Sequence, residues 1–155
     1  MRRQKQASAR NCFVCGVHNP TSLHLKFYQT RAGEVSSEFT VEEPYQGYPG
    51  IVHGGIAAAI LDEAAGRALM GIFPPRFMVT ARLEVKYRSR IPVGQPLHVT
   101  GRVLQDRGRL ARAWSGLYNS SDELLAEAEA LLVDMPDPPE PEALEPSGWK
   151  IYPDA

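Results

Sequence analysis

Hydrophobic and polar residues alternate with a period of two along most of this chain, and that period predicts β-strands. The runs at 23–28 and 34–41 form a predicted hairpin that turns near Ala32-Gly33. The longest run covers residues 77–88, where one face is apolar and the other is polar and includes Thr80. Strands of this kind are typical of an antiparallel sheet with one buried face.

Three more strands are predicted towards the C-terminus, after a break at 92–94. Alternating runs at 97–103 and 111–117 lie on either side of a turn at 106–108. The segment 123–133 contains good helix formers but also alternates acid and alanine. We predict a strand there, because the segment follows a turn and would close the antiparallel meander.

One long segment departs from this alternation. Residues 56–69 are apolar around almost the whole helical circumference, which predicts a buried helix. The segment starts at His53-Gly54-Gly55, and two glycines at a helix start leave backbone N–H groups uncovered by side chains. The helix dipole favours negative charge at that end. We therefore expect a site that can hold an oxyanion.

Two acidic residues interrupt the predicted buried helix. Glu63 has Arg67 four residues further on, so an ion pair is its simplest role. Asp62 has no such partner, and the residues three and four positions away are all small, which leaves space for a substrate. Buried acids are rare unless they are paired or functional. Asp62 is therefore the candidate base or nucleophile, and the competing interpretation is a hydrogen bond to a neighbouring backbone group.

Composition and charge narrow the range of functions. With 155 residues, 43% of them hydrophobic, the chain is long enough for one ordinary domain with its own core. The 17 basic and 18 acidic residues leave a net charge of −1, which argues against a nucleic-acid partner. No apolar run reaches the length of a membrane span, and no hydrophobic region follows the basic N-terminus as in a secretory signal. A cytoplasmic protein without a membrane partner is the expectation.

The two ends differ in charge from the rest of the sequence. Residues 1–10 carry four basic residues and no acid, and residues 134–155 combine prolines with acidic residues. We predict a flexible basic tail, a domain at 11–133 and a Pro-rich acidic extension. The apolar cluster at 149–152 is expected to fold back onto the body or onto a neighbouring subunit.

A hairpin, one long helix and four antiparallel strands make an α+β architecture in which a curved antiparallel sheet wraps one central helix. The segment from Tyr45 to Gly55, followed by Leu61-Asp62-Glu63-Ala64, resembles the hotdog-fold acyl-CoA thioesterases of the phenylacetate-pathway type. This resemblance extends over residues 11–133. It implies the hotdog fold and the hydrolysis of an acyl- or aryl-acyl-CoA to free acid and CoA, without a cofactor or a metal.

The resemblance also implies roles for individual positions. The Gly54 N–H would polarise the thioester carbonyl, His53 would orient the loop or the substrate, and Asp62 would be the catalytic carboxylate. Thr80 falls where such enzymes keep a hydroxyl that places the attacking water. An ordinary surface threonine fits the alternation equally well.

One position departs from the family pattern. Many relatives have an asparagine where this chain has Gly47, and the neighbouring Gln46 is the candidate to replace it. Attack by a water that Asp62 and Thr80 hold, and direct attack by Asp62, therefore both stay open.

Further residues are candidates for binding the substrate. They are Gly55, Gln46, Glu63, Arg88 and Arg90. The two arginines follow the longest strand, where their guanidinium groups are placed to meet the phosphates of CoA. Solvated surface arginines are the competing interpretation.

The resemblance implies a homodimer or a dimer of dimers. The nine residues from His53 to Asp62 span about 13.5 Å of helix, which is too far for the Gly54 N–H and Asp62 of one chain to act on the same carbonyl. We therefore expect antiparallel helices of two subunits to share each active site.

The two cysteines leave two interpretations open. Cys12 and Cys15 have the spacing of zinc ligands, with His18 and His24 as further ligands. The chain has no second cysteine pair, however, and the histidines are not at zinc-finger distances. Buried structural thiols without a metal are therefore the favoured interpretation.

Two other functions stay open beside hydrolysis. An enoyl-thioester hydratase or dehydratase on the same fold would need a histidine facing a carboxylate, and His53 with Asp62 would supply that pair. A non-catalytic acyl-CoA binder would keep the fold without turnover. Neither releases a free thiol, so a thiol-release assay separates both from a thioesterase.

Overall fold

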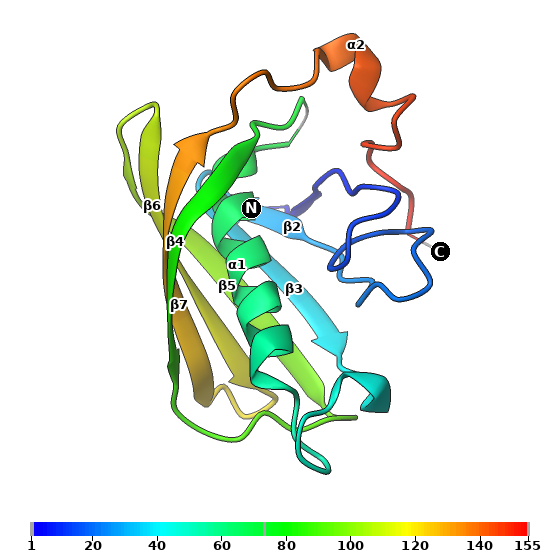
Figure 1. Cartoon of the computed structure of the whole chain (residues 1–155), viewed down its shortest axis with the longest axis vertical. Coiled ribbons are helices and arrows are strands. Elements are labelled where there is room, and N and C mark those ends of the chain that lie inside the picture. Colours follow the sequence, from blue (N-terminus) through cyan, green and yellow to red (C-terminus); the bar gives the residue numbers. More distant parts are fainter. Residues whose placement is uncertain (1, 73, 155) are drawn as a thin grey trace.

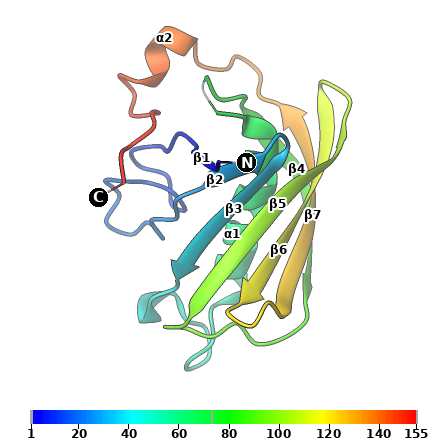
Figure 2. The ribbon, with the colours of Figure 1, turned by 180° about the vertical axis from the view of Figure 1, so that it is seen from behind.

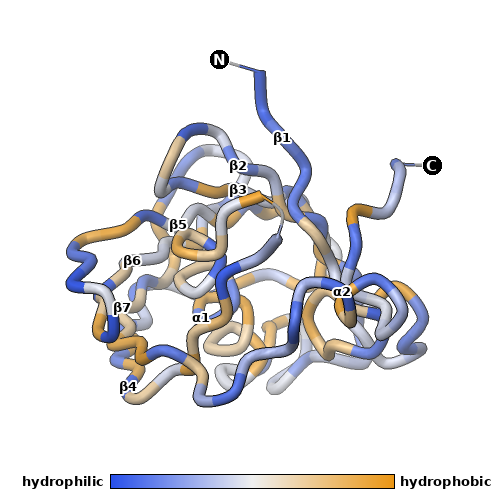
Figure 3. Tube along the Cα trace, turned by 90° about the horizontal axis from the view of Figure 1, so that it is seen from above, coloured by the Kyte–Doolittle hydropathy of each residue, from blue (hydrophilic) through white to orange (hydrophobic). Residues whose placement is uncertain are grey.

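A long helix, α1 (Gly54–Met70), lies against a seven-stranded sheet in the computed structural model, which describes residues 2–72 and 74–154 (Figure 1). The strand order is β1-β2-β3-β5-β6-β7-β4 and all neighbours are antiparallel, as seen from behind in Figure 2. The sheet curves around α1 (Figure 3), so the predicted α+β fold with one central helix is confirmed. The strands are β1 (Gln4–Lys5), β2 (Tyr28–Arg31), β3 (Glu34–Thr40), β4 (Met78–Tyr87), β5 (Pro96–Asp106), β6 (Leu110–Asn119) and β7 (Leu124–Asp134), and the short helices are η1 (Glu43–Tyr45) and α2 (Pro141–Leu144).

The predicted strands are present, with one shift near the hairpin. The hairpin of β2 and β3 turns at Gly33, which has a φ of 78°. β2 is shorter than the alternation indicated, because residues 23–27 do not pair in the sheet. Leu25 is buried there, and its N–H donates to the carbonyl oxygen of Val14 over 2.9 Å. Alternation in this stretch therefore reflects a buried loop, whereas the ambiguous segment at 123–133 does form β7.

A β-bulge interrupts β4, the longest strand predicted from the sequence. The register shifts between Thr80 and Arg82, which pair with adjacent residues of β7, so Ala81 is an extra residue. An extra residue reverses which side chains face the helix. Thr80 before the bulge and Leu83 after it both face α1. The predicted placement of Thr80 on the face opposite Leu83 is wrong, because alternation alone does not reveal an inserted residue.

The backbone of α1 comes unusually close to the sheet. A Cβ atom placed on Gly101 of β5 would lie 2.2 Å from the carbonyl oxygen of Ala64. Nearby, the buried Ser115 Oγ on β6 donates to the carbonyl oxygen of Leu61 over 2.7 Å. Small residues are required where the two backbones approach most closely. Buried alanines accordingly occupy the interface on both sides, at Ala57, Ala64, Ala65, Ala68, Ala113, Ala128 and Ala130.

The N-terminal segment packs on the body, which differs from the expectation of a flexible tail. β1 extends the sheet beside β2, and residues 6–9 are buried. The Gln6 Nε2 donates to the carbonyl oxygen of Arg67 over 3.0 Å, and the Arg67 Nη1 donates to the carbonyl oxygen of Ala7 over 2.7 Å. The prediction of a flexible tail rests on composition, which does not show that the buried Arg67 guanidinium needs acceptors from this segment. Residue 1 of the predicted tail lies outside the described residues.

The C-terminal extension folds back onto the chain's own body. The Trp149 ring meets the Phe77 ring edge-on, with centroids 5.1 Å apart, and Lys150 pairs with Ser8 in an isolated bridge. This confirms the expectation that the apolar cluster at 149–152 folds back onto the body. Residue 155 of the predicted extension lies outside the described residues. Within the described ranges, no helix combines the length and the apolarity needed to cross a membrane.

Replacing Gly101 by alanine tests the close helix–sheet contact. We expect Gly101→Ala to lower the free energy of unfolding by about 1–3 kcal/mol or more, because the added methyl group would overlap the Ala64 backbone. Gly66→Ala is the matched control, since a Cβ at Gly66 meets nothing within 4 Å among the described residues. That change should stabilise the helix by roughly 0.5–1 kcal/mol. Urea unfolding followed by circular dichroism measures both, and equal stabilities of the two variants would contradict this account of the packing.

Candidate active site

The predicted oxyanion site lies at the exposed start of α1. The His53 side chain caps the helix, because its Nδ1 accepts a hydrogen bond from the Gly55 N–H over 2.9 Å. The Gly54 N–H meets no acceptor among the described residues. The N–H group expected to polarise a carbonyl is therefore free, whereas the Gly55 N–H, expected to help bind the substrate, is used by the cap.

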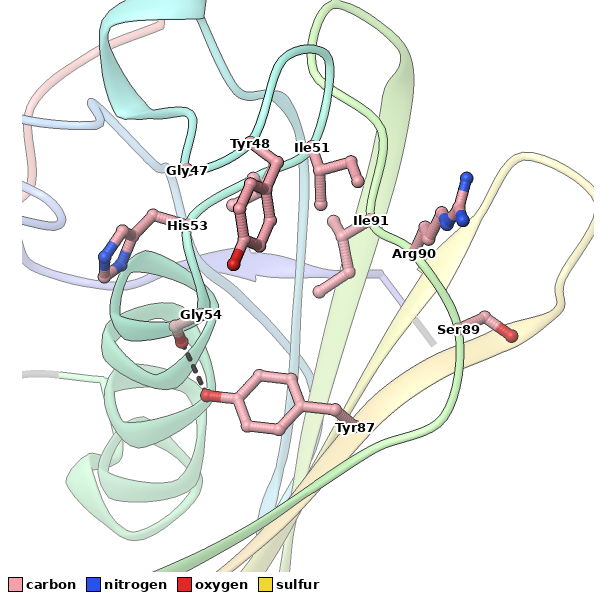
Figure 4. Close-up of a pocket in the computed structure, with 10 residues that line it drawn as sticks. Gly47, Tyr48, Ile51, His53, Gly54, Tyr87, Ser89, Arg90 and Ile91 are labelled. Carbon is pink, nitrogen blue, oxygen red and sulfur yellow. Dashed lines mark hydrogen bonds between the residues drawn. The ribbon is translucent and has the colours of Figure 1, made fainter.

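A cavity of about 500 Å³ opens beside Gly54 (Figure 4). Tyr87, at the end of β4, donates its hydroxyl hydrogen to the Gly54 carbonyl oxygen over 2.6 Å. Tyr48 also lines this cavity and is 80% exposed, while the His53 ring points away from the Tyr87 ring (Figure 4). Ile51, Ile91 and Arg90 complete much of the wall. The wall is thus largely apolar, with one cation at its edge.

Asp62 and Thr80 are brought together in the structure. The Thr80 Oγ1 donates to the Asp62 Oδ1 over 2.6 Å, which the bulge at Ala81 makes possible by turning Thr80 towards the helix. Burial raises the pKa of Asp62, the charge of Glu63 adds to this effect, and the Thr80 hydrogen bond opposes it. The Asp62 Oδ2 has no donor among the described residues. A partly buried carboxylate with one free oxygen is equipped to act as a base or a nucleophile.

Asp62 lies at a second, smaller cavity of about 200 Å³. Thr80 and Gly66 also line it, as does Trp149 from the C-terminal extension. The space predicted beside Asp62 from its small neighbours is therefore present. Gly54 belongs to the other cavity, eight residues or about 12 Å away along the helix. Within one chain, the Gly54 N–H and the Asp62 carboxylate therefore lie at different cavities along the helix.

Glu63 forms the ion pair expected from its spacing. The Arg67 Nε donates to the Glu63 Oε1 over 2.9 Å, and the Arg67 side chain is only 1% exposed. The Arg67 Nη2 has no hydrogen-bond partner among the described residues. Glu63 also lines the cavity of Asp62, but its Oε1 is already occupied by the guanidinium. Glu63 therefore pairs with the buried Arg67 charge, and only its Oε2 is left to bind a substrate.

The other predicted substrate ligands divide into two groups. Arg90 lines the cavity beside Gly54. Arg88 instead donates through Nε to the Glu127 Oε2 over 2.6 Å, and Gln46 accepts the Gly50 N–H through Oε1 over 3.0 Å. Neither Arg88 nor Gln46 lines either of these two cavities. Gln46 therefore shapes the loop before the helix.

Two tyrosines of this site were not candidates in the sequence. Tyr48 belongs to the segment that resembles the thioesterases, and Tyr87 ends the longest alternating run. The sequence does indicate the position of Tyr87, because it continues the alternation of Leu83 and Val85 and is therefore expected on the strand face that meets the helix. The exposure of Tyr48 depends on the loop path, which no local pattern predicts.

The two cysteines lie close together and are both free thiols. The Cys12 Sγ accepts the N–H groups of Val14 and Cys15 over 3.3 and 3.4 Å. The hydrogen bond from the Cys15 side chain lowers the pKa of Cys12 to about 6, and the same bond raises the pKa of Cys15. Cys15 is buried, as expected, and Cys12 is half-buried.

Comparison with known proteins gives a family match over the region that carries the site. Residues 49–126, half of the chain, match the model of the Thioesterase superfamily. The acyl-coenzyme A thioesterase THEM4 of Rattus norvegicus is 32% identical over 142 residues, which cover 90% of this chain and 60% of the rat protein. The chain therefore spans less than two thirds of the length of this curated relative.

Solved structures share the same fold. A thioesterase superfamily protein is 29% identical, with a TM-score of 0.73, over 80% of this chain and 63% of its own. A Streptococcus mutans UA159 protein bound to acetyl CoA has a TM-score of 0.65 at 19% identity, over 72% of this chain and 88% of its own. At 19% identity the second likeness is one of fold alone. The hotdog fold expected from the sequence is thereby confirmed.

Proposed function

The chain belongs to the thioesterase superfamily, and from that premise we propose that it hydrolyses the thioester of an acyl- or aryl-acyl-CoA to a free acid and CoA. The contact between Asp62 and Thr80 carries this proposal. It places a carboxylate of raised pKa beside a hydroxyl, at a cavity, on the same helix that begins with a free N–H. Acyl transfer needs a group that activates the nucleophile and a donor that stabilises the oxyanion.

Each polar group has a separate role in the proposed reaction. The Gly54 N–H stabilises the negative charge that develops on the carbonyl oxygen during attack. Asp62 acts through its free Oδ2, either by taking a proton from the attacking water or by attacking the carbonyl itself. Thr80 holds Oδ1 and so orients the carboxylate.

The cavity beside Gly54 is the proposed binding site for the pantetheine arm of CoA. Its apolar wall includes Ile51 and Ile91, which suits an extended chain with few charges. Arg90 lies at this cavity and is therefore the candidate for the CoA phosphates, ahead of Arg88, which already pairs with Glu127.

We propose that the complete site needs two copies of the chain. β4 is an edge strand of the sheet, and unpaired edge strands readily pair with another strand. Its outer positions include the exposed Val79, and the partly uncovered stripe of α1 is formed by small residues such as Ala58 and Gly66. Antiparallel pairing of two β4 strands would also set two α1 helices antiparallel. Gly54 of one copy would then approach Asp62 of the other.

Gly54→Pro tests the oxyanion donor directly. Gly54 is the first helical residue, where proline is tolerated, and His53 has a ψ of 137°, which suits a residue before proline. The change replaces the N–H by the Cδ atom of the proline ring, which cannot donate to the carbonyl oxygen, so we expect kcat for thiol release to fall by at least about 10²–10³ while the fold is kept. Gly54→Ala is the matched control, because its Cβ would make an ordinary contact of 3.5 Å with the Tyr87 hydroxyl. Similar activity in the two variants would remove the Gly54 N–H from the mechanism.

Asp62→Asn tests the carboxylate and the reaction class together. The amide is isosteric and its oxygen still accepts the Thr80 hydrogen bond, so we expect normal unfolding and a fall in thiol release of at least about 100-fold. Asp122→Asn is the control, because Asp122 is exposed and has a φ of 60°, which asparagine tolerates. Short, medium, long and aryl acyl-CoAs are assayed with the wild type. Hydration of an enoyl-CoA without thiol release would indicate a hydratase, and tight binding without turnover a carrier.

Complementation tests the shared site. Refolding Asp62→Asn chains with Gly54→Pro chains should restore activity, because each mixed dimer has one site with both defects and one with neither. Random mixing makes half of the dimers mixed, so recovery should reach about a quarter of the wild-type rate. Native mass spectrometry confirms that mixed dimers form. Mixed dimers without activity would mean that each site is built within one chain.

A further inference from the structure

We propose that Cys12, Cys15 and Glu63 form a binding site for a thiophilic divalent metal ion, with Zn²⁺ as the expected ion. One ligand atom from each of these residues lies within 4.8 Å of the other two. Zinc bonds of about 2.0–2.3 Å in tetrahedral geometry place ligand atoms roughly 3.3–3.8 Å apart. The group therefore needs only a small inward shift of its side chains to close on a metal ion.

The turn that carries the two cysteines has the shape of a preformed pair of ligands. The Val14 and Cys15 N–H groups both point at the Cys12 Sγ, at 3.3 and 3.4 Å, and favour its thiolate form. A Cβ at Gly16 would lie 2.2 Å from the Cys12 carbonyl oxygen, so the tight turn requires glycine there. These contacts hold one sulfur atom in place before any ion arrives.

Glu63 supplies the third ligand from a different part of the chain. The buried Arg67 guanidinium holds its Oε1 at 2.9 Å and leaves the other oxygen for the ion. Carboxylate ligands of metal sites are usually oriented by such a hydrogen bond. Two thiolates and one carboxylate carry three negative charges, and Arg67 supplies one positive charge. A divalent cation would neutralise the remainder inside a mostly buried cluster.

This geometry changes the interpretation drawn from sequence spacing. The spacing of the cysteines points to His18 and His24 as further ligands, whereas the structure gathers Glu63 beside the cysteines. Three protein ligands leave a fourth coordination position, which in proteins takes a water or a small ligand. Cys12 and Glu63 both line the cavity of Asp62, so that position is open to this cavity. The ion would also fasten the N-terminal segment to α1.

Metal titration of the whole chain tests the site without reference to its hydrolytic activity. Protein stripped with a chelator is titrated with Co²⁺ and then with Zn²⁺, and metal content is measured by native mass spectrometry. We expect about one ion per chain, with thiolate-to-cobalt charge-transfer absorption that Zn²⁺ abolishes by displacement. A Cys12→Ser, Cys15→Ser double variant should lose both the absorption and the bound ion.

Carboxylate variants separate Glu63 from the thiols. Glu63→Gln should weaken Zn²⁺ binding by at least about tenfold. Glu127→Gln, which removes a carboxylate paired with Arg88 outside the cluster, should leave binding unchanged. Circular dichroism shows whether each variant is folded. If Glu63→Gln unfolds because Arg67 loses its ion-pair partner, Glu63→Asp replaces it: this variant keeps the charge on a shorter side chain and should weaken Zn²⁺ binding to the same extent.

Two results would overturn the proposal. A folded wild-type chain that binds neither Co²⁺ nor Zn²⁺ stoichiometrically has no such site. Binding that survives in the double serine variant, or that a folded Glu63 variant leaves unchanged, would show that the ion is held elsewhere or by other ligands. Thiol release is measured separately on the same samples, so loss of the metal site and failure of the proposed hydrolysis are distinguished.

Discussion

The close approach of α1 to β5 determines where the other parts of the site lie. Glycine at 101 lets the strand meet the helix backbone at Ala64, and Ser115 adds a hydrogen bond one turn earlier, at Leu61. A helix held at two backbone points on one side has little freedom to rotate or slide. Its N-terminal N–H and its carboxylate therefore keep fixed positions relative to the strands, which is the preorganisation that an oxyanion site requires.

A buried guanidinium connects this core to both the ends and the chemistry. Arg67 binds the Ala7 carbonyl, pairs with Glu63 and lies over the Phe27 ring with its Cζ 4.7 Å from the ring centroid. Burying a charge is costly unless its hydrogen bonds are satisfied, so the N-terminal segment becomes part of the fold by supplying acceptors. Order at residues 6–9 and the orientation of Glu63 thus have a common cause.

Alternation and spacing predicted the helix, most strands, the Glu63–Arg67 pair and the candidate residues Gly54 and Asp62. These features depend on residues near one another in the sequence. The bulge at Ala81 was missed because one inserted residue leaves the alternation intact while reversing its faces. The packed N-terminus and the gathering of Glu63 beside Cys12 and Cys15 depend on contacts between segments far apart in the chain, and no local period records them.

The C-terminal extension gives the Asp62 cavity a wall that belongs to neither the sheet nor the central helix. Trp149 lines this cavity and contacts the Phe77 ring edge-on, whereas Asp62 and Thr80 line it from α1 and β4. Changes in such an appended segment can reshape a cavity without disturbing the packing that determines the fold. Related chains with the same helix and strands can therefore differ in the shape of this cavity through the length and aromatic content of their extensions.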